Sequence, residues 1–367
     1  MSLKRKTVFV AMSGGVDSSV AAALLKAQGY RVIGIFMKNW TENFNFGKNN
    51  SFFNATLCPW AEDQEDMRKV CTQLDIPFYT FDFEEEYKNR VINYFFEGYQ
   101  KGITPNPDIM CNKEIKFKLF LEKSIRLGAD LIATGHYARV KTTGQEKSRV
   151  YHLLKGKDPN KDQSYFLYTL NQEKLKKVLF PIGDYDKQKI RKIARKLNLA
   201  THDKKDSQGI CFIGEVDLEK FLKTRIKRKV GKVITTAGEI VGKHEGISFY
   251  TIGQRRGLKI GGGIPYYVAA KDLKSNTLIV AKGNQDLKLY NDQLIATNLS
   301  WVAKEPKYPF NCLAKIRYRQ NDQKATVSCL SKDSVGVKFN SPQRAITPGQ
   351  SVVFYHNDSV IGGGIIQ

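Results

Sequence analysis

The stretch that decides the fold reads TVFVAMSGGVDSSVAAALLKA from Thr7 to Ala27. Its first five residues are typical of a buried strand, and its Ala/Leu-rich end is typical of a helix. Between them, the glycines of Ser13-Gly14-Gly15-Val16-Asp17-Ser18 permit a sharp turn, and the serine hydroxyls and first helical amides can donate hydrogen bonds to an anion. A Walker-type phosphate loop needs a Lys-Ser/Thr pair after its last glycine. Val16-Asp17 stands there instead, which disfavours a kinase or a GTPase.

Apolar strand patterns recur outward from this stretch and alternate with helical patterns. We expect strands at 31–37, 78–82 and 131–136, and helices at 59–74, 87–100, 113–127 and 187–197. This alternation predicts the fold class α/β, with a doubly wound parallel sheet. The Asn- and Phe-rich residues 40–56 follow the second strand, on the side where ligands bind in open α/β sheets.

The pattern changes after about residue 215, where glycines become frequent and strands become short. From about residue 291, strands alternate at short intervals around the turn signal Pro348-Gly349, which predicts a small C-terminal β-barrel. The predicted domains are therefore a catalytic domain at 1–215, a small central domain at 216–288 and the barrel at 289–367. Apolar and basic residues alternate over 314–319, so we expect one face of that strand in the barrel core and three cations on the other.

The charge and cysteine content narrow the class of protein. The 367 residues carry 59 Lys+Arg against 36 Asp+Glu, a formal charge of +23, which favours a polyanionic partner such as nucleic acid over mere Lys-rich usage. No apolar run approaches a membrane span, and residues 1–6 lead into the first strand without an apolar leader, so we expect a soluble, cytoplasmic protein. The six cysteines contain no Cys-x-x-Cys pair, which disfavours a disulfide scaffold, a zinc ribbon and an iron–sulfur cluster.

Two cysteines lie in segments that suit reactive thiols. Cys111 follows a proline-stiffened loop with Asp108 and precedes the predicted helix at 113, where the helix dipole would favour a thiolate. Cys211 lies between two glycines with basic residues upstream. From the residues alone, a buried, apolar role is the more common one for either thiol. The basic helix at 187–197 has two readings as well, a phosphate-backbone contact or a solvated face.

Several separated motifs together resemble the bacterial tRNA-specific 2-thiouridylases, a family of the PP-loop ATP pyrophosphatase superfamily, and the match covers essentially the whole chain. The motifs are SGGVDS at 13–18, NPDIMCNK at 106–113, KDQSYFL at 161–167, KDSQGICFIG at 205–214 and RYRQ at 317–320. Residues 40–57 depart from the family pattern, and their role stays open.

The resemblance implies a tRNA-uridine 2-sulfurtransferase. ATP would adenylate the O2 of the wobble uridine in tRNAs for Lys, Glu and Gln, and sulfur would then replace that oxygen, giving 2-thiouridine, AMP and pyrophosphate. Cys211 would carry the sulfur as a persulfide supplied by a cysteine desulfurase or a sulfur-relay protein. Cys111 would be the nucleophile, and Asp108 a general acid/base or base-positioning group. The family's cofactors would be ATP and Mg²⁺, with Asp17 helping to hold the magnesium ion.

The family pattern also transfers onto two sets of binding residues. The implied ATP site comprises Ala11, Met12, Ser13, Gly14, Gly15, Val16, Asp17, Ser18, Met37 and Gly135. The implied tRNA contacts are Asn106, Pro107, Asp108, His136, Lys161, Asp162, Gln163, Arg317, Tyr318 and Gln350. The first three of these would receive the flipped wobble base.

Two other classes compete with this reading. A PP-loop ligase acting on a small molecule would need neither paired thiols nor a large positive charge. A tRNA-binding protein without catalytic activity would not need an intact ATP loop.

Overall fold

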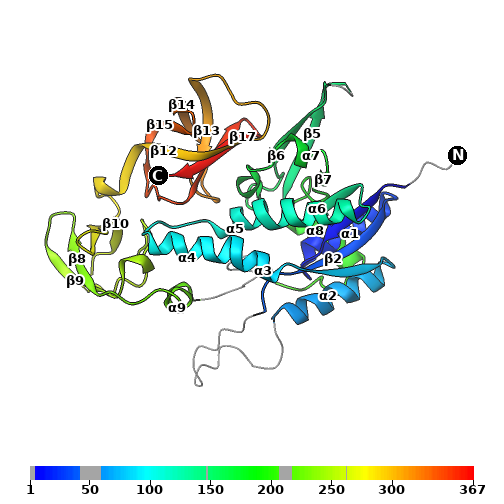
Figure 1. Cartoon of the computed structure of the whole chain (residues 1–367), viewed down its shortest axis with the longest axis horizontal. Helices are drawn as coiled ribbons and strands as arrows, with labels where there is room; N and C mark the ends of the chain where they lie inside the picture. The colour runs from blue at the N-terminus through cyan, green and yellow to red at the C-terminus, as the bar shows by residue number, and fades with distance from the viewer. Residues whose placement is uncertain (1–4, 42–58, 146–147, 206–216, 262) are drawn as a thin grey trace.

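The computed structural model describes residues 5–41, 59–145, 148–205, 217–261 and 263–367. Three sheets organise these ranges: five strands in the N-terminal part, four in the central part and eight around the C-terminal barrel. Figure 1 shows the C-terminal strands above the long helices, with the central part at the opposite end from the N-terminal sheet. The predicted α/β fold with a terminal barrel is confirmed.

The N-terminal sheet is parallel and has the order β3-β2-β1-β4-β7. Its strands are β1 (Thr7–Ala11), β2 (Arg31–Lys38), β3 (Phe78–Asp82), β4 (Leu131–Thr134) and β7 (Val178–Leu179). Val8 and Val10 pack into one core, whereas Phe9 and Ala11 pack into another, because successive strand residues face opposite sides. The sheet is therefore covered on both faces, which is the doubly wound arrangement that the sequence predicts.

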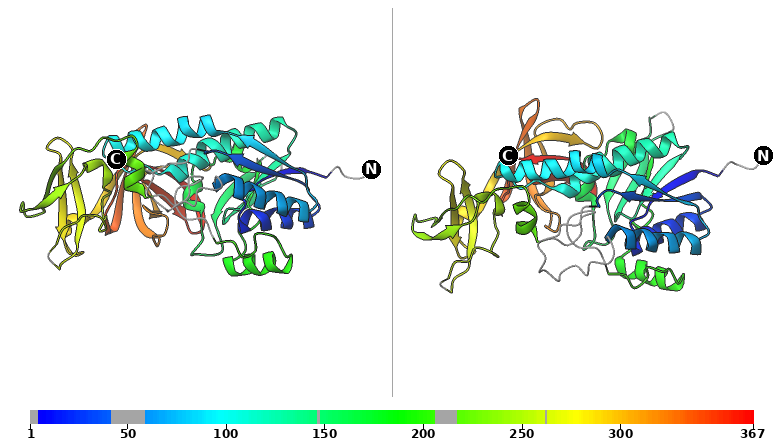
Figure 2. Two further views of the ribbon diagram at one scale, coloured as in Figure 1. Left: turned by 90° about the horizontal axis from the view of Figure 1, so that it is seen from below. Right: turned by 60° about the horizontal axis from the view of Figure 1, so that its bottom comes forward.

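Helices cover both faces of the N-terminal sheet, as the two views of Figure 2 show. The helices α1 (Val16–Ala27), α2 (Pro59–Gln73) and α8 (Lys187–Lys196) contribute to the core behind Val8. The opposite core receives two continuous helical stretches. One consists of α3 (Glu84–Tyr87), η1 (Lys88–Ile92) and α4 (Asn93–Gln100), and the other of α5 (Pro107–Met110), η2 (Cys111–Phe120) and α6 (Leu121–Arg126), with π-helical geometry in η1 and η2. Two short helices complete this part, η4 (Ser164–Leu167) and α7 (Gln172–Leu175).

The second of these stretches begins earlier than expected. The sequence predicts a helix from residue 113 after an extended loop, but the helix starts at Pro107. Asn106 is its N-cap and its side-chain oxygen accepts a hydrogen bond from the Ile109 amide at 3.1 Å. The fixed φ of a proline suits the first helical position. Pro107 therefore begins the helix, although the sequence analysis placed it in an extended loop before the helix.

The central part is a four-stranded sheet of order β10-β11-β8-β9, preceded by α9 (Leu218–Lys223). Its strands are β8 (Gly231–Thr235), β9 (Ile240–His244), β10 (Tyr266–Asp272) and β11 (Thr277–Lys282), with the short helices η5 (Ile247–Phe249) and η6 (Leu287–Leu289). It docks on the end of α4, where Lys271 donates a hydrogen bond to the Gly102 carbonyl at 3.0 Å.

The C-terminal strands close on themselves because β12 pairs with both β15 and β17. They are β12 (Tyr290–Trp301), β13 (Phe310–Lys315), β14 (Gln323–Ser331), β15 (Ser334–Arg344), β16 (Ser351–His356) and β17 (Ser359–Ile366). The same sheet continues into a hairpin of the N-terminal part, β5 (Ala138–Thr143) and β6 (Val150–Lys155). This shared sheet, which the sequence analysis did not predict, joins the two parts directly.

The prediction for residues 314–319 is wrong in one respect. Ala314 and Ile316 are buried as expected, but the strand ends at Lys315 and the basic residues do not form an outward row. Lys315 lies 3.8 Å from an Asp162 carboxylate oxygen, and the Arg317 guanidinium donates to the Ala345 carbonyl at 2.9 Å. Lys315 is therefore turned into the fold, whereas Arg317 stays exposed and is held by a backbone carbonyl.

Candidate functional site

The turn after β1 lies at the carboxyl end of that strand. The strand order reverses at this point of the sheet, because β2 lies on one side of β1 and β4 on the other. Ligands of open α/β sheets bind at this switch point. Gly14 has φ of +69°, and a Cβ there would lie 2.2 Å from the Asp63 carbonyl oxygen of α2. The turn is fastened internally, since the Ser13 amide donates to the Ser18 hydroxyl oxygen at 3.2 Å.

The remaining residues expected at the ATP site approach the same edge. Gly135 lies just after β4 and packs against the first turn of α1, where a Cβ would lie 2.8 Å from the Ser18 amide nitrogen. Met37 is buried near the end of β2, beside β1. Ala11 and Met12 are buried at the end of β1, and Gly15 is the N-cap of α1. The sheet therefore brings together residues that are more than a hundred positions apart in the sequence.

Charged side chains that the sequence analysis missed surround this turn. The Asp17 carboxylate oxygen Oδ1 accepts hydrogen bonds from the Tyr137 hydroxyl at 2.8 Å and from the Lys187 ammonium at 2.7 Å. On the other side, the Lys204 ammonium contacts Asp63 at 2.7 Å and Asp66 at 2.6 Å. Burial raises the pKa of Asp63 above its ordinary value, and Lys204 opposes that shift. The predicted helix at 187–197 placed Lys187 at its first position, but nothing in the sequence indicated its contact with Asp17.

Cys111 lies inside the helix that begins at Pro107 and is fully buried. Its backbone amide bonds to the Asp108 and Pro107 carbonyls, so it is not one of the helix's exposed terminal donors. Next to it, Asn112 is buried and donates to the Phe166 carbonyl at 3.3 Å. Asp108 lies in the first turn and is half-buried.

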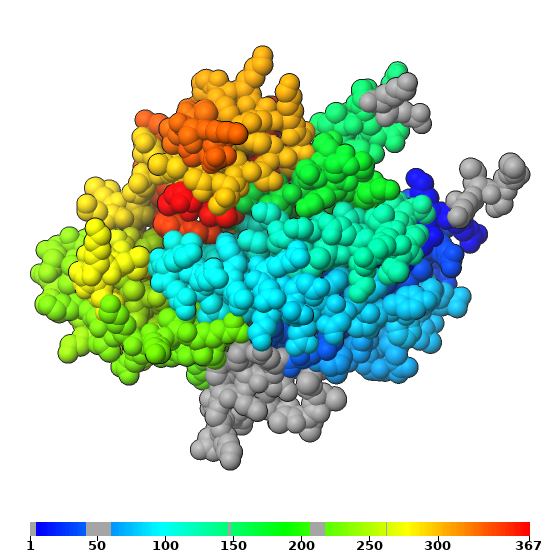
Figure 3. Space-filling view, viewed as in Figure 1, coloured from blue at the N-terminus to red at the C-terminus, as the bar shows by residue number. Residues whose placement is uncertain are grey.

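All three parts of the protein meet at residues 104–106. The Thr104 amide donates to the Pro348 carbonyl at 2.9 Å, and its hydroxyl donates to Thr251 of the central part at 3.3 Å. The Gln350 side chain of the barrel donates to the Thr104 carbonyl at 2.9 Å and accepts from Asn106 at 3.3 Å. The space-filling view in Figure 3 shows the red C-terminal strands against the cyan helices at this junction. Asn106 and Gln350, both expected to contact tRNA, are thus brought together.

Two of the other residues expected at tRNA, the half-buried Tyr318 and the exposed Arg317, have partners within the protein. Tyr318 packs on Phe166 with ring centroids 4.6 Å apart. Arg317 bonds to carbonyls of both the barrel and the central part, at 2.9 Å and 3.3 Å, and burial lowers the pKa of its guanidinium. The sequence alone indicated neither of these internal contacts.

The 161–163 segment packs on the end of β4. Gln163 accepts a hydrogen bond from the Tyr137 amide at 3.0 Å, and Asp162 is buried and accepts from the Gly156 and Ser164 amides at 3.0 and 3.1 Å. His136 is also buried, with Nδ1 2.7 Å from the Thr134 hydroxyl, and burial lowers its pKa well below the ordinary value. Lys161 is half-buried beside them. These contacts make Asp162 and His136 supports of the loop, and their contact with tRNA stays a prediction.

Cys211 and the rest of 206–216 lie outside the described residues, as do residues 42–58. Within the described ranges, no cluster of three or more His, Cys, Asp or Glu side chains suits a metal ion. The described helices include none that is both long and apolar enough to cross a membrane.

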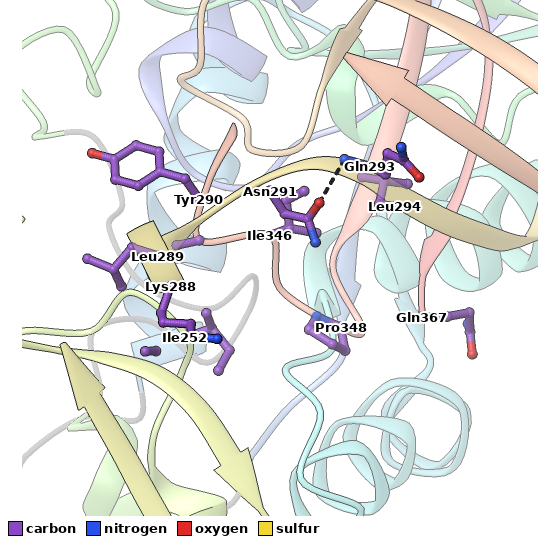
Figure 4. A pocket seen from close by; sticks show the side chains of 12 residues that line it. Ile252, Lys288, Leu289, Tyr290, Asn291, Gln293, Leu294, Ile346, Pro348 and Gln367 are labelled. Atoms are coloured by element: carbon purple, nitrogen blue, oxygen red, sulfur yellow. Dashed lines mark hydrogen bonds between the residues drawn. The ribbon is translucent and has the colours of Figure 1, made fainter. Parts of the chain in front are cut away.

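A cavity of about 270 Å³ lies between the central part and the barrel (Figure 4). Ile252 and Ala269 line it from the central part, and Tyr290, Asn291, Ile346 and Pro348 line it from the barrel. Of the described residues expected at the ATP or thiol site, none lines this cavity, so it is separate from them.

Known protein families and relatives match nearly the full length of the chain. Residues 6–215 match the family described as tRNA methyl transferase HUP domain, residues 219–282 the tRNA methyl transferase PRC-barrel domain and residues 291–366 the aminomethyltransferase beta-barrel domain. The tRNA-specific 2-thiouridylase MnmA of Listeria welshimeri is 53% identical, over 98% of this chain and 94% of that protein. The protein of the same name from Alkaliphilus oremlandii is 51% identical, over 99% of this chain and 97% of its own length.

Among solved structures, the NMN synthetase of Francisella tularensis covers 55% of this chain and 66% of its own, with a TM-score of 0.32 and 14% identity. A likeness at that score supports no conclusion about this chain.

Proposed function

The chain belongs to the family of tRNA-specific 2-thiouridylases, and on that basis we propose that it is an ATP-dependent tRNA-uridine 2-sulfurtransferase. The reaction converts the wobble uridine of tRNA to 2-thiouridine and releases AMP and pyrophosphate. The observation that carries this proposal is the end-to-end match, 51 to 53% identical to two proteins of that name over 98 to 99% of the chain. The phosphate-type turn at the sheet's switch point supports it independently.

ATP is proposed to bind at the turn 11–18, with Met37 and Gly135 beside it. The amides that open α1 would hold the phosphates, since a helix N-terminus attracts an anion. The uridine O2 attacks the α-phosphorus, the bond to the β-phosphate oxygen breaks, and pyrophosphate leaves. The oxygen is then part of an AMP leaving group, which carbon 2 can lose.

A magnesium ion that arrives with ATP needs only one or two protein carboxylates, because phosphates and water supply its other ligands. Asp17 fits this requirement, since its contacts with Tyr137 and Lys187 both use Oδ1 and its carboxylate would hold the ion through Oδ2. When bound, the ion would neutralise phosphate charge.

Sulfur transfer is proposed to use Cys211 and Cys111. The terminal sulfur of a Cys211 persulfide attacks carbon 2 of the activated uridine, and AMP departs with the original oxygen. The Cys111 thiolate then attacks the Cys211 sulfur, the sulfur–sulfur bond to the base breaks, and its electron pair stays on the base as 2-thiouridine. The two cysteines end as a disulfide, which an external thiol must reduce before the next turnover. Asp108, three residues before Cys111, is proposed to position the base or exchange its proton.

The substrate is proposed to be tRNA with anticodons for Lys, Glu or Gln, recognised by the residues at 106–108, 136, 161–163, 317–318 and 350. The formal charge of +23 supports a polyanionic substrate. A cysteine desulfurase or a relay protein would supply the sulfur, in the cytoplasm.

The decisive experiment incubates the protein with unmodified tRNA, ATP, Mg²⁺ and a persulfide donor and measures 2-thiouridine by mass spectrometry of the digested tRNA. Cys111→Ser and Cys211→Ser should each abolish the product, whereas Cys312→Ser, a buried cysteine of the barrel, should retain it. Normal thiolation by the Cys211→Ser protein would refute the two-thiol mechanism. Binding of tRNA should weaken steeply as salt rises, because phosphate contacts release counterions.

A further inference from the structure

We call the turn at residues 13–18 the phosphate turn, because the function proposed above places the phosphates of ATP there. Lys187, the first residue of α8, points toward this turn and not toward the surface. Its Nζ lies 2.7 Å from Asp17 Oδ1, and its side chain is only 13% exposed. The Tyr137 hydroxyl donates to the same oxygen at 2.8 Å. A cation and a hydroxyl from two separate segments therefore converge on the Asp17 carboxylate.

The backbone of Lys187 is held in place by contacts on both sides of the residue. Its amide donates to the buried Asp158 carboxylate at 3.0 Å, and Asp186 caps α8 by accepting from the Lys189 amide at 2.7 Å. Further along α8, Ile190 and Ala194 are buried in the same core as α1. Lys187 therefore extends from a helix that packs against α1, the helix that follows the phosphate turn. Such packing fixes the position of a binding group relative to its site.

A cation at this turn would offset the negative charges that meet there when ATP binds. Asp17 places a negative charge in a loop that is to bind the polyphosphate of ATP, and like charges at this range repel. As the bond between the α- and β-phosphates breaks, negative charge accumulates on the departing pyrophosphate. A positive group already fixed at the site stabilises that charge without reorganisation.

We propose that Lys187 contacts the substrate: its ammonium group binds the polyphosphate of ATP and stabilises the pyrophosphate as it leaves. This inference rests on the function proposed above and adds a residue to its phosphate site. An ammonium group is a compact positive charge, so its contact with Asp17 does not cancel its attraction for a phosphate oxygen. For the first residue of the helix at 187–197, this role toward ATP replaces both readings of the sequence, a phosphate-backbone contact and a solvated face.

The test titrates inorganic pyrophosphate into the full-length protein by calorimetry, with AMP as the comparison ligand. Lys187→Gln should weaken pyrophosphate binding about tenfold or more, since it removes a charged hydrogen bond, and should leave AMP binding within about twofold. Lys192→Gln is the matched control: it removes the same charge from an exposed position of the same helix and should leave both affinities unchanged.

A double variant separates phosphate binding from mere neutralisation of Asp17. If Lys187 only neutralised Asp17, then Asp17→Asn with Lys187→Gln would bind pyrophosphate as tightly as Asp17→Asn alone. We expect the double variant to bind about tenfold more weakly than Asp17→Asn. Equal affinities, or wild-type affinity in Lys187→Gln, would overturn the assignment. A wild-type protein that binds neither ATP nor pyrophosphate would instead overturn the proposed function itself.

Discussion

Replacing Gly14 by alanine would strain the phosphate turn in two ways. The residue has φ of +69°, a region that costs a residue with a Cβ about 1 to 2 kcal/mol. Its new Cβ would also lie 2.2 Å from the Asp63 carbonyl oxygen, so the turn or α2 must shift, at a further cost of about 1 to 3 kcal/mol. We therefore expect Gly14→Ala to lower the free energy of unfolding of the N-terminal part by about 2 to 5 kcal/mol.

Two nearby glycines separate these contributions. Gly29 has φ of +86°, and beyond its chain neighbours no atom of the described residues lies within 4 Å of the place that a Cβ would take. Gly29→Ala should therefore show the backbone cost alone, about 1 to 2 kcal/mol. Gly15 has φ of −100°, and its Cβ would meet only the Ser13 hydroxyl at 3.4 Å among the described side chains. Gly15→Ala should change stability by less than about 1 kcal/mol.

The measurement is urea unfolding followed by far-ultraviolet circular dichroism, with an unchanged m-value as the check that the same structure unfolds. Calorimetry with ATP provides the second reading. Gly14→Ala should bind ATP more weakly because the turn is displaced, whereas Gly29→Ala, at the far end of α1, should bind it normally. If Gly14→Ala lost no more stability than Gly29→Ala, the close approach of α2 to the turn would be refuted.

Three further predictions concern the other parts of the chain. Burial lowers the pKa of Lys271 to about 8 from 10.5, so between these pH values the unfolded chain binds more protons and stability should rise with pH, by up to about 3 kcal/mol. Lys271→Met should remove that slope from urea unfolding measured between pH 8 and pH 10, and an unchanged slope would contradict the assignment. Gln350→Glu replaces the donor that faces the Thr104 carbonyl at 2.9 Å by an acceptor, and should cost about 1 to 3 kcal/mol in thermal unfolding, a cost that wild-type stability would exclude. Cys329 is exposed and should react with iodoacetamide in the native protein, whereas Cys312, buried with its pKa raised to about 12, should be modified only after unfolding; mass spectrometry of the labelled peptides distinguishes the two.

Much of the N-terminal fold was predictable because its signals are local. The strand at 7–11, the turn at 13–18 and the strand at 78–82 are bounded as the apolar pattern predicts. The helix at 187 begins where the pattern places it as well. The helix start at Pro107 was missed because the same proline suits both an extended loop and a first helical turn, and the choice depends on the cap at Asn106.

The candidate site was predictable only in its parts. The motif at 13–18 indicates an anion site from its residue types. The sulfur chemistry of the two cysteine motifs is implied only by the resemblance to the 2-thiouridylases. Their surroundings were not predictable. Arg317 and Asp162 look like surface charges in the sequence, yet both are used to join elements of the fold.

By itself, then, the sequence determined the phosphate turn, the alternation of strands and helices around it, and the barrel at the C-terminal end. These follow from backbone preferences and apolar periodicity, which act over a few residues. Only the tertiary structure decided that Lys187 contacts Asp17 across 170 positions, and that β17 extends its sheet into the hairpin of β5 and β6. Such pairs depend on how whole elements dock, and no local pattern of residues encodes the partner on the other side.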